Sequence, residues 1–520
     1  FKQKTAYEML RSLVGSEMCI RDSLYFGLLD AHRAFCRRRG LEGVLHFGRI
    51  VPRIRRLARG GTPRALLAAI PAPPRPAEAA GPAPAVRGLI LEGRRLEVLV
   101  CGDGLEGARP AAWARLSAAW GLALRAAPGG RGVLWTTRAP RPEGPPRPKP
   151  PAARPARPRL DRRVALAAIA ARVKELGRLA GVHAFQAGRS LEGRPIWALE
   201  IACPGGGGLA SHARRRLLRP TLLVNARHHA NEVAGTQAAL RLAWELAATA
   251  PGRRLLRRVN AVVIPLENPD GVALLEALLP EAPGHKLHAA RYNAAGVEWY
   301  ADYFAAAPRF PEARPKAGLW QAWLPLWVLD AHGVPSHEWD QPFAGNAPGP
   351  FRAYWIPRAF VYAILPFLDT PGHPGHRWAR RIGRLLGRAL RGDPRIAARE
   401  AEFRDRYLRY ARRWEPEFFP APAPAGGLTL CATEGRLAGL NFAARRFPVT
   451  VAEVVTEVTD EVVRGRLLED CGRAHLLAAR ALLAGLARLA GGRLERRRLA
   501  GGGVRLAWRS RQAGAAGGEK

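Results

Sequence analysis

The sequence has few cysteines and no long hydrophobic run. Its six cysteines are irregularly spaced and form no CxxC pair, which excludes both a disulfide framework and a cysteine-based metal site. This usage favours a reducing compartment, so we predict a cytoplasmic protein. A bilayer-spanning helix needs about 20 consecutive apolar residues, and the apolar stretch 360–368 is far shorter. We therefore predict no membrane span.

Acidic residues are also scarce. The chain has 82 Lys+Arg against 43 Asp+Glu, a net charge of +39. Charge of this size favours nucleic acid or another anionic surface as a partner. The basic residues are nearly all arginine, however, and are spread among abundant Ala, Gly and Pro without a known nucleic-acid motif. We interpret the charge as compositional bias and expect no specific nucleic-acid partner.

The chain of 520 residues is too long for one compact core, so we expect two or three domains. Residues 1–23 contain both methionines of the chain and resemble translated sequencing-adapter read-through, so we exclude them and expect the native N-terminus to be missing. Residues 24–137 predict a small N-terminal α+β domain of unknown role, with a helix over 24–57 and strands over 89–100 and 122–135.

A Pro/Arg-rich linker over 138–163 is the clearest predicted boundary, because proline fixes φ and removes backbone donors. The following domain, 164–490, alternates short apolar strands with helical patterns, which is typical of an α/β sheet. Within it, 339–441 predicts a helical insertion with basic amphipathic helices. A Gly/Arg-rich tail, 491–520, is expected to be flexible.

The most informative stretch is TLLVNARHHANEV, residues 221–233. The apolar run 222–224 predicts a short buried strand that stops at Asn225, and a helical pattern begins near Glu232. His229 and Glu232 lie three residues apart at this junction. An imidazole and a carboxylate at that spacing can bind one metal ion from one side of a turn.

Two later strands offer the remaining groups of a hydrolytic zinc site, which requires three protein ligands and one open position. His332 follows the apolar strand 327–329 in LDAHGVPSHEW, and Asp330 beside it is a candidate to orient a ligand. The alternating strand 448–458 carries Glu453 and Glu457 on one face, and either is a candidate general base. We predict one zinc ion per chain.

Six motifs, GRSLEGRPIWALEI, ARHHANE, NPDG, RYNAAGVEW, DAHGVPSHEW and TEVTDE, occur in the order found in the carboxypeptidase A family of zinc peptidases. Over 164–489 the chain thus resembles a divergent, bacterial-type member of this family. The resemblance implies a carboxypeptidase-like mixed sheet flanked by helices. It also implies that His229, Glu232 and His332 are the zinc ligands. It further implies Glu457 as the general base, and Arg291 as the group that polarises the scissile carbonyl and binds substrate.

The chain departs from the family in its expected substrate-binding residues. Where the family usually has D-L-N-R, this sequence has Glu298, Trp299, Tyr300 and Ala301, so the Asn-Arg clamp for a terminal carboxylate is absent. Tyr300 offers one hydrogen bond. Further candidates for substrate binding or pocket shape are Asn231, His337, Glu338 and Trp339. Arg445 and Arg446 are candidates to replace the missing clamp.

Asn231 stands where many members carry an arginine, and H-x-N-E is similar to the acyl-amino-acid deacylase branch. No tyrosine follows Tyr410, so the family's mobile tyrosine has no counterpart. We predict zinc-dependent hydrolysis of a peptide or of an acylated amino compound. Two alternatives stay open: a deacylase or amidase that needs no free C-terminus, and a non-catalytic basic binding module. The sequence leaves the oligomeric state open.

Overall fold

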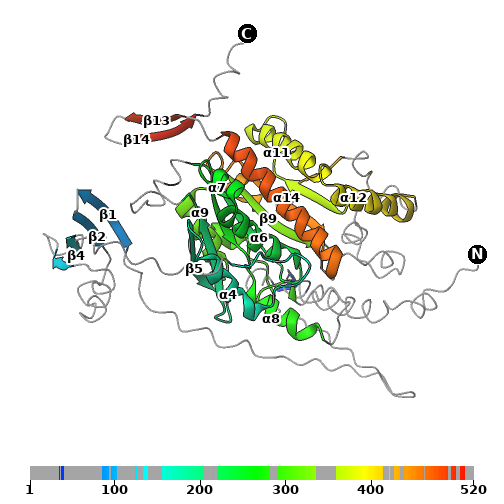
Figure 1. Ribbon diagram of the computed structural model, residues 1–520, viewed down its shortest axis with the longest axis horizontal. Coiled ribbons are helices and arrows are strands. Elements are labelled where there is room, and N and C mark those ends of the chain that lie inside the picture. The colour runs from blue at the N-terminus through cyan, green and yellow to red at the C-terminus, as the bar shows by residue number, and fades with distance from the viewer. Residues whose placement is uncertain are drawn as a thin grey trace, which may run out of the picture. The chain divides into compact units, whose positions relative to one another are not determined.

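A computed structural model describes residues 155–203, 219–280, 290–334, 359–413, 427–433, 439–461 and 463–489, with residues 34, 37–39, 215 and 421 and the backbone of strands within 85–138 and 493–509. The chain divides into two compact units. One is 74–154, and the other comprises 1–73 and 155–520. Each unit is described by itself (Figure 1).

The larger unit is built on one mixed eight-stranded sheet with the order β11-β10-β12-β9-β7-β8-β6-β5. Its centre is parallel, since β8, β7, β9 and β12 pair side by side in one direction, while β10 runs antiparallel to β12 and β6 antiparallel to β8. The strands are β5 (Val182–Arg189), β6 (Pro195–Ile201), β7 (Thr221–Ala226), β8 (Asn260–Ile264), β9 (Trp327–Val334), β10 (Val361–Leu365), β11 (Thr429–Ala432) and β12 (Ala452–Thr459).

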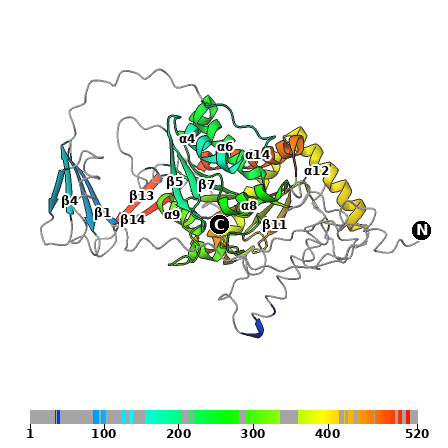
Figure 2. The ribbon, with the colours of Figure 1, turned by 90° about the horizontal axis from the view of Figure 1, so that it is seen from below.

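Helices cover both faces of this sheet (Figure 2). One face packs against α4 (Leu166–Leu176), α6 (Ala234–Ala248), α11 (Pro374–Arg391) and α14 (Gly465–Leu489). The other face packs against η3 (Tyr300–Phe304), α9 (Ala313–Trp323) and α13 (Phe442–Arg446). The remaining helices are α7 (Ala250–Leu256), α8 (Pro269–Leu278), α12 (Pro394–Tyr407) and the π-helical turn η6 (Leu408–Arg412).

The middle of strand β7, residues 222–224, is a continuous apolar run because the strand is buried on both faces of the sheet. Leu222 and Val224 belong to the core on the α6 side, whereas Leu223 belongs to the core on the α9 side. Because side chains of a strand alternate between faces, a strand that is buried on both faces has apolar residues at every position. The mixed sheet between two helical layers confirms the fold class that the sequence predicts.

The segment 339–441 differs from the helical insertion that we expected. Its helices α11 and α12 are present, but β10 and β11 also come from it and extend the main sheet beyond β12. A short apolar run such as 361–365 has no periodicity that distinguishes a strand from a piece of helix. Only its pairing with β12, which lies far away in the chain, makes it a strand. In addition, β9 is longer than the predicted 327–329 and includes His332.

The unit 74–154 contains an antiparallel sheet, in the order β1-β2-β4-β3, of β1 (Ala85–Glu92), β2 (Arg95–Cys101), β3 (Ala123–Ala126) and β4 (Val133–Arg138). Each of the two predicted strands there is in fact a pair of strands, because the predicted runs include chain reversals. The helix predicted over 24–57 lies almost wholly outside the described residues.

In the C-terminal segment, where we expected a flexible tail, β13 (Arg493–Arg498) pairs antiparallel with β14 (Val504–Arg509). None of the helices in the described parts of the chain combines the length and the apolar character required to cross a bilayer.

Candidate metal centre

The turn between β7 and α6 carries two of the candidate ligands. Arg227 adopts the left-handed conformation (φ 56°), and its buried guanidinium donates from Nε and NH2 to the Ala230 carbonyl, at 3.1 and 2.6 Å. At the start of α6 the Ala234 N–H donates to Oδ2 of Asp460, at 2.6 Å. These bonds hold the turn closed at both ends, so His229 and Glu232 are presented by backbone of defined conformation.

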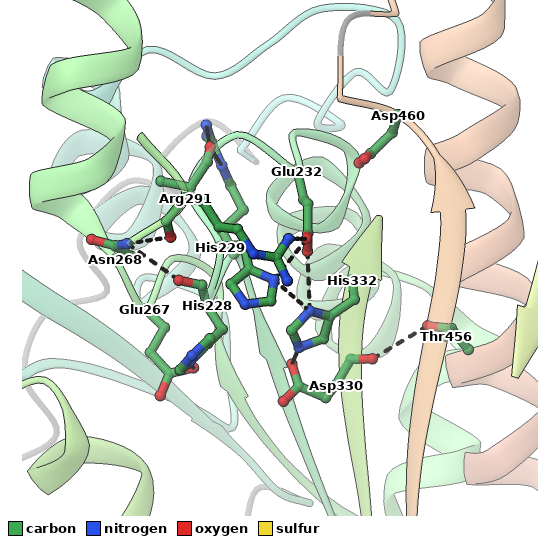
Figure 3. A network of polar contacts seen from close by, with 12 residues as sticks. His228, His229, Glu232, Glu267, Asn268, Arg291, Asp330, His332, Thr456 and Asp460 are labelled. Carbon is green, nitrogen blue, oxygen red and sulfur yellow. Dashed lines mark hydrogen bonds and ion pairs between the residues drawn. The ribbon is translucent and has the colours of Figure 1, made fainter. Parts of the chain in front are cut away.

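His229, Glu232 and His332 converge on one point, with their ligand atoms all within 4.8 Å of one another. Figure 3 shows both rings and the carboxylate turned toward each other. His229 Nδ1 lies 2.7 Å from Glu232 Oε1, His332 Nδ1 lies 3.0 Å from Glu232 Oε2, and the two Nδ1 atoms are 3.1 Å apart. All three side chains are buried.

This donor set fits a zinc ion. Tetrahedral zinc bonds of about 2.0–2.2 Å separate the donor atoms by about 3.3 Å. The distances between the three donors are slightly shorter, so a small outward movement of the side chains accommodates the cation. Two imidazole nitrogens and one carboxylate form the ligand set typical of a catalytic zinc site, which leaves one position for water or substrate.

Each imidazole has a second partner on its outer nitrogen. His229 Nε2 lies 3.1 Å from Glu298 Oε1, and His332 Nε2 lies 3.1 Å from Asp330 Oδ1. A carboxylate on Nε2 favours the tautomer whose Nδ1 lone pair faces the metal. Asp330 was predicted for such a role. Glu298 was predicted only as a departure from the family pattern, although its acidic side chain at that position was an available signal.

Arg291 lies between two carboxylates of the site. Its NH1 donates to Glu232 Oε1 at 2.9 Å and its Nε to Glu298 Oε1 at 3.3 Å. The backbone of this segment is tied to the histidine turn by Asn268, whose Nδ2 donates to the carbonyls of Arg291 and His228, at 3.2 Å each. The NPDG motif, whose Asn268 caps α8, therefore also joins two segments of the site.

The two candidate bases have different surroundings. Glu457 is the register partner of His332 on the adjacent strand, and burial raises its pKa well above the usual value, with Glu232 adding to the effect and His332 opposing it. Glu453 is buried; its Oε1 lies 3.5 Å from Lys316 Nζ, and Oε2 accepts the Phe442 N–H. Glu457 alone of the two thus interacts electrostatically with the ligand cluster.

Aromatic side chains pack beside the histidines. The Tyr300 ring stacks on His228 with centroids 4.1 Å apart, and its hydroxyl lies 3.2 Å from His332 Nε2. His228 is not among the converging ligands. Its Nδ1 lies 3.0 Å from the Tyr303 hydroxyl, and burial lowers its pKa to about 4. A neutral His228 therefore acts as a packing partner for the tyrosines.

The remaining predicted substrate-binding residues lie partly in the histidine turn and on α13, and partly outside the described residues. Asn231 is fully buried in the histidine turn. Arg445 and Arg446 lie on α13, and both guanidinium groups stand over the Phe304 ring at 5.8 Å. His337, Glu338 and Trp339 lie outside the described residues, as does the side chain of Tyr410.

Comparisons with known proteins find similarity to zinc carboxypeptidases over part of the chain. The family model of zinc carboxypeptidases matches residues 175–301. A metallo-carboxypeptidase from Burkholderia cenocepacia is 15% identical, covering 70% of this chain and 77% of its own, with a TM-score of 0.38. A metallo-carboxypeptidase from Pseudomonas aeruginosa is 17% identical, covering 69% and 74%, with a TM-score of 0.38.

One curated protein, DNA damage response protein C of Deinococcus radiodurans, is 36% identical over 92 residues. That match covers 18% of this chain and 35% of the Deinococcus protein, so only about a third of the latter is represented. The family match, in contrast, contains the strand, the histidine turn and the segment of Arg291 and Glu298. Residues 175–301 of the chain are therefore similar to the zinc carboxypeptidase family.

Proposed function

We propose that this protein is a zinc-dependent hydrolase that cleaves a peptide or amide bond and binds one zinc ion through His229, Glu232 and His332. One observation supports this most strongly. Three donor atoms from β9 and from the turn after β7 lie within 4.8 Å of one another, and Glu457 is the register partner of His332. A metal site and an acid–base group are thus combined on one face of the sheet.

In this proposal the bound zinc supplies Lewis acidity, which makes water a nucleophile near neutral pH. Glu457 accepts a proton from the attacking water and passes it to the leaving amine. Arg291 donates hydrogen bonds to the substrate carbonyl oxygen as negative charge develops there. For this, its guanidinium leaves Glu232, which it now contacts at 2.9 Å, while Glu298 remains a partner for Nε.

The residues around the centre favour a substrate without a required free C-terminus. Ala301 cannot make the bidentate contact that an arginine makes with a carboxylate. The Tyr300 hydroxyl faces His332 and offers one hydrogen bond. A deacylase or amidase activity of the same centre is therefore the second candidate. A non-catalytic basic binding module is the third, and it requires no metal.

Metal analysis tests the proposal directly. Protein purified without added metal should contain about one zinc per chain, and His332→Ala and His229→Ala should lose it while remaining folded. Folded wild-type protein that neither contains nor takes up zinc would refute the hydrolase. If that protein also bound nucleic acid with a steep dependence on salt, the basic module would be favoured.

A further inference from the structure

We infer that Lys316 is a positioning residue for His332 and acts through Asp330, an inference that rests on the proposed function. Lys316 projects from α9, and 1% of its side chain is exposed. Its Nζ donates to Asp330 Oδ2 at 2.9 Å. The other carboxylate oxygen, Oδ1, lies 3.1 Å from His332 Nε2, so Asp330 joins the buried cation to the outer nitrogen of a candidate ligand.

Asp330 is held from three sides. Besides Lys316 and His332, it accepts a hydrogen bond at Oδ1 from Asn225 Nδ2, at 2.6 Å. Asn225 and Asp330 are register partners on β7 and β9. Because the asparagine and the lysine occupy different oxygens, the carboxylate plane cannot rotate without breaking one of these bonds. The orientation of His332, and hence the direction of its Nδ1 lone pair, is fixed by this arrangement.

Packing alone does not account for a cation at this place. The buried neighbours of Lys316 on α9 are apolar or aromatic, for example Leu319 and Trp323. Its ammonium group is stabilised by Glu453 Oε1 at 3.5 Å and by the face of the Tyr303 ring, 4.7 Å to the centroid. A methionine would fill similar volume without the desolvation cost of a buried charge. The cation therefore has a role that methionine could not supply, namely to hold the Asp330 carboxylate.

The test is zinc affinity, measured by competition with a chelator, together with the visible spectrum of the cobalt-substituted protein. Lys316→Met should weaken zinc binding by about 10- to 100-fold and change the cobalt spectrum. If Lys316 acts through Asp330, the double variant with Asp330→Asn should bind zinc no more weakly than Asp330→Asn alone. Should Lys316→Met fail to fold, Lys316→Met combined with Glu453→Gln removes the unbalanced charge and should show the same loss of affinity.

Trp323→Phe is the matched control. Trp323 is buried on the same helix, and its Nε1 donates to Glu200 Oε1 at 2.7 Å, away from Asp330. This change should lower thermal stability without changing zinc affinity. Unchanged zinc affinity in the Lys316 variants, or full additivity with Asp330→Asn, would overturn the inference while leaving the proposed function in place. Wild-type protein without zinc would overturn both.

A separate observation concerns α11, which carries six arginines and no acidic residue. Five of them are exposed and recur at spacings of three and four, so they form one row along the helix: Arg377, Arg380, Arg384, Arg388 and Arg391. The row is about 21 Å long, at about 1.5 Å per residue. No carboxylate within the described ranges pairs with any of these five arginines.

Several other arginines nearby are neutralised. Arg399 on α12 pairs with Asp470 at 3.0 Å, and Arg409 in the following turn η6 pairs with Asp405 at 3.0 Å. On α14, Arg473 pairs with Asp393 and Arg480 with Glu245. Compositional bias explains why arginine is frequent in these helices, but it does not explain why, among the described residues, five exposed arginines without a carboxylate partner line up along α11.

We propose that this row binds the phosphate backbone of duplex nucleic acid without reading its sequence. A single line of guanidinium groups matches a linear array of phosphates. A membrane surface is less suitable, because the apolar face of α11, with Ile382 and Leu386, is buried in the protein core and cannot enter a bilayer. The proposed binding involves only the phosphate backbone of the nucleic acid, which agrees with the absence of a sequence-reading motif from this chain.

Fluorescence anisotropy with a short random-sequence DNA duplex, over a range of salt concentrations, tests it. Replacing Arg380, Arg384 and Arg388 by Gln should weaken binding and reduce the slope of log K against log salt by about 2 to 3, because about one counterion is retained per lost contact. The control replaces Arg253, Arg254 and Arg257 at α7, an equal change of charge. Equal effects of both triple variants, or a selective loss of binding to anionic lipid vesicles instead of DNA, would overturn the proposal.

Discussion

His332 on β9 and Glu457 on β12 are register partners on adjacent parallel strands. Register partners on parallel strands point to the same face of the sheet, so the third candidate ligand and the candidate base lie side by side. Glu453, two pleats earlier, lies on that same face but is engaged by Lys316 and Phe442. One strand thus presents two carboxylates, of which only Glu457 is a neighbour of the ligand cluster.

Replacing this glutamate tests its role as general base. Glu457→Gln keeps the size of the side chain but cannot accept the proton, so kcat should fall by about 10²- to 10⁴-fold. Zinc content should stay at the wild-type value, since Glu457 is not one of the converging donors. Elemental analysis and steady-state kinetics on the same preparation give both numbers.

Glu453→Gln is the control for that experiment, because it changes the same residue type on the same face of the same strand. Its activity per bound zinc should remain within about 10-fold of wild type, a change of at most about 1.4 kcal/mol in barrier height. A larger loss in Glu453→Gln than in Glu457→Gln would reverse the assignment of the base.

The absence of the carboxylate clamp predicts a tolerant substrate terminus. Ala301 has no side-chain donor, so an amidated peptide should be cleaved with a kcat/KM within about 10-fold of that of the free acid. In an enzyme that has the clamp, amidation would remove a bidentate contact to a charged group, which costs about 1.5–3 kcal/mol or more. Matched peptides with free and amidated C-termini provide the measurement. If only free acids are cleaved, another cation binds the terminus, and Arg445 and Arg446 are then the residues to replace.

The NPDG motif should matter for stability as well as for the site. Asp270 is fully buried and accepts from Ser190 Oγ at 2.6 Å, the Glu192 N–H at 2.9 Å and Arg194 NH1 at 2.8 Å. Asp270→Ala leaves these donors without their acceptor and should reduce the free energy of unfolding by about 2–3 kcal/mol. Urea denaturation gives the value. Arg189→Ala, an exposed change in the same hairpin, should cost less than about 0.5 kcal/mol.

One half-buried carboxyl group should make stability depend on pH. Burial raises the pKa of Glu400 to about 7, although its carboxylate accepts the N–H groups of Phe360 and Val361 at 3.0 and 3.1 Å. Its folded pKa exceeds the unfolded one, so the folded protein binds more protons between about pH 4.5 and 7, and stability falls as pH rises through this range.

Glu400→Gln removes that dependence and can still accept both hydrogen bonds. Relative to wild type, the variant should gain about 1–3 kcal/mol between about pH 5 and pH 8. Denaturant unfolding of both proteins at the two pH values gives this difference. A difference between variant and wild type that is the same at both pH values would show that Glu400 has no raised pKa.

Much of the fold follows from local patterns. The apolar runs of β7, β8 and β12 predict buried strands because each is short, β-branched or leucine-rich and bounded by turn residues. The edge strand β11 and its neighbour β10 were not predicted as part of the sheet. Their runs are equally short, and only pairing with β12 and with each other distinguishes them from pieces of a helical segment.

The candidate site divides in the same way. A strand, a tight turn and a helix follow one another within 221–248. Because His229 and Glu232 lie close together in this short stretch, the sequence alone predicts that both stand at the junction between strand and helix. His332 was predicted from its place after an apolar strand, and motif order then supported His332 and Glu457. The acidic residue type of Glu298 was a signal, but its contact with His229 forms only in the folded chain. Lys316 as the partner of Asp330 has no such signal.

The amino-acid sequence by itself determined the resemblance to zinc carboxypeptidases, the mixed sheet and the residue types of a candidate metal centre, because short motifs and strand patterns are properties of neighbouring residues. Only the tertiary structure decided which carboxylate stands beside the ligands, which cation holds Asp330 and which arginines keep their charge uncompensated. Those outcomes depend on distances of about 3 Å between side chains from separate elements, and burial and strand register, not spacing along the chain, set such distances.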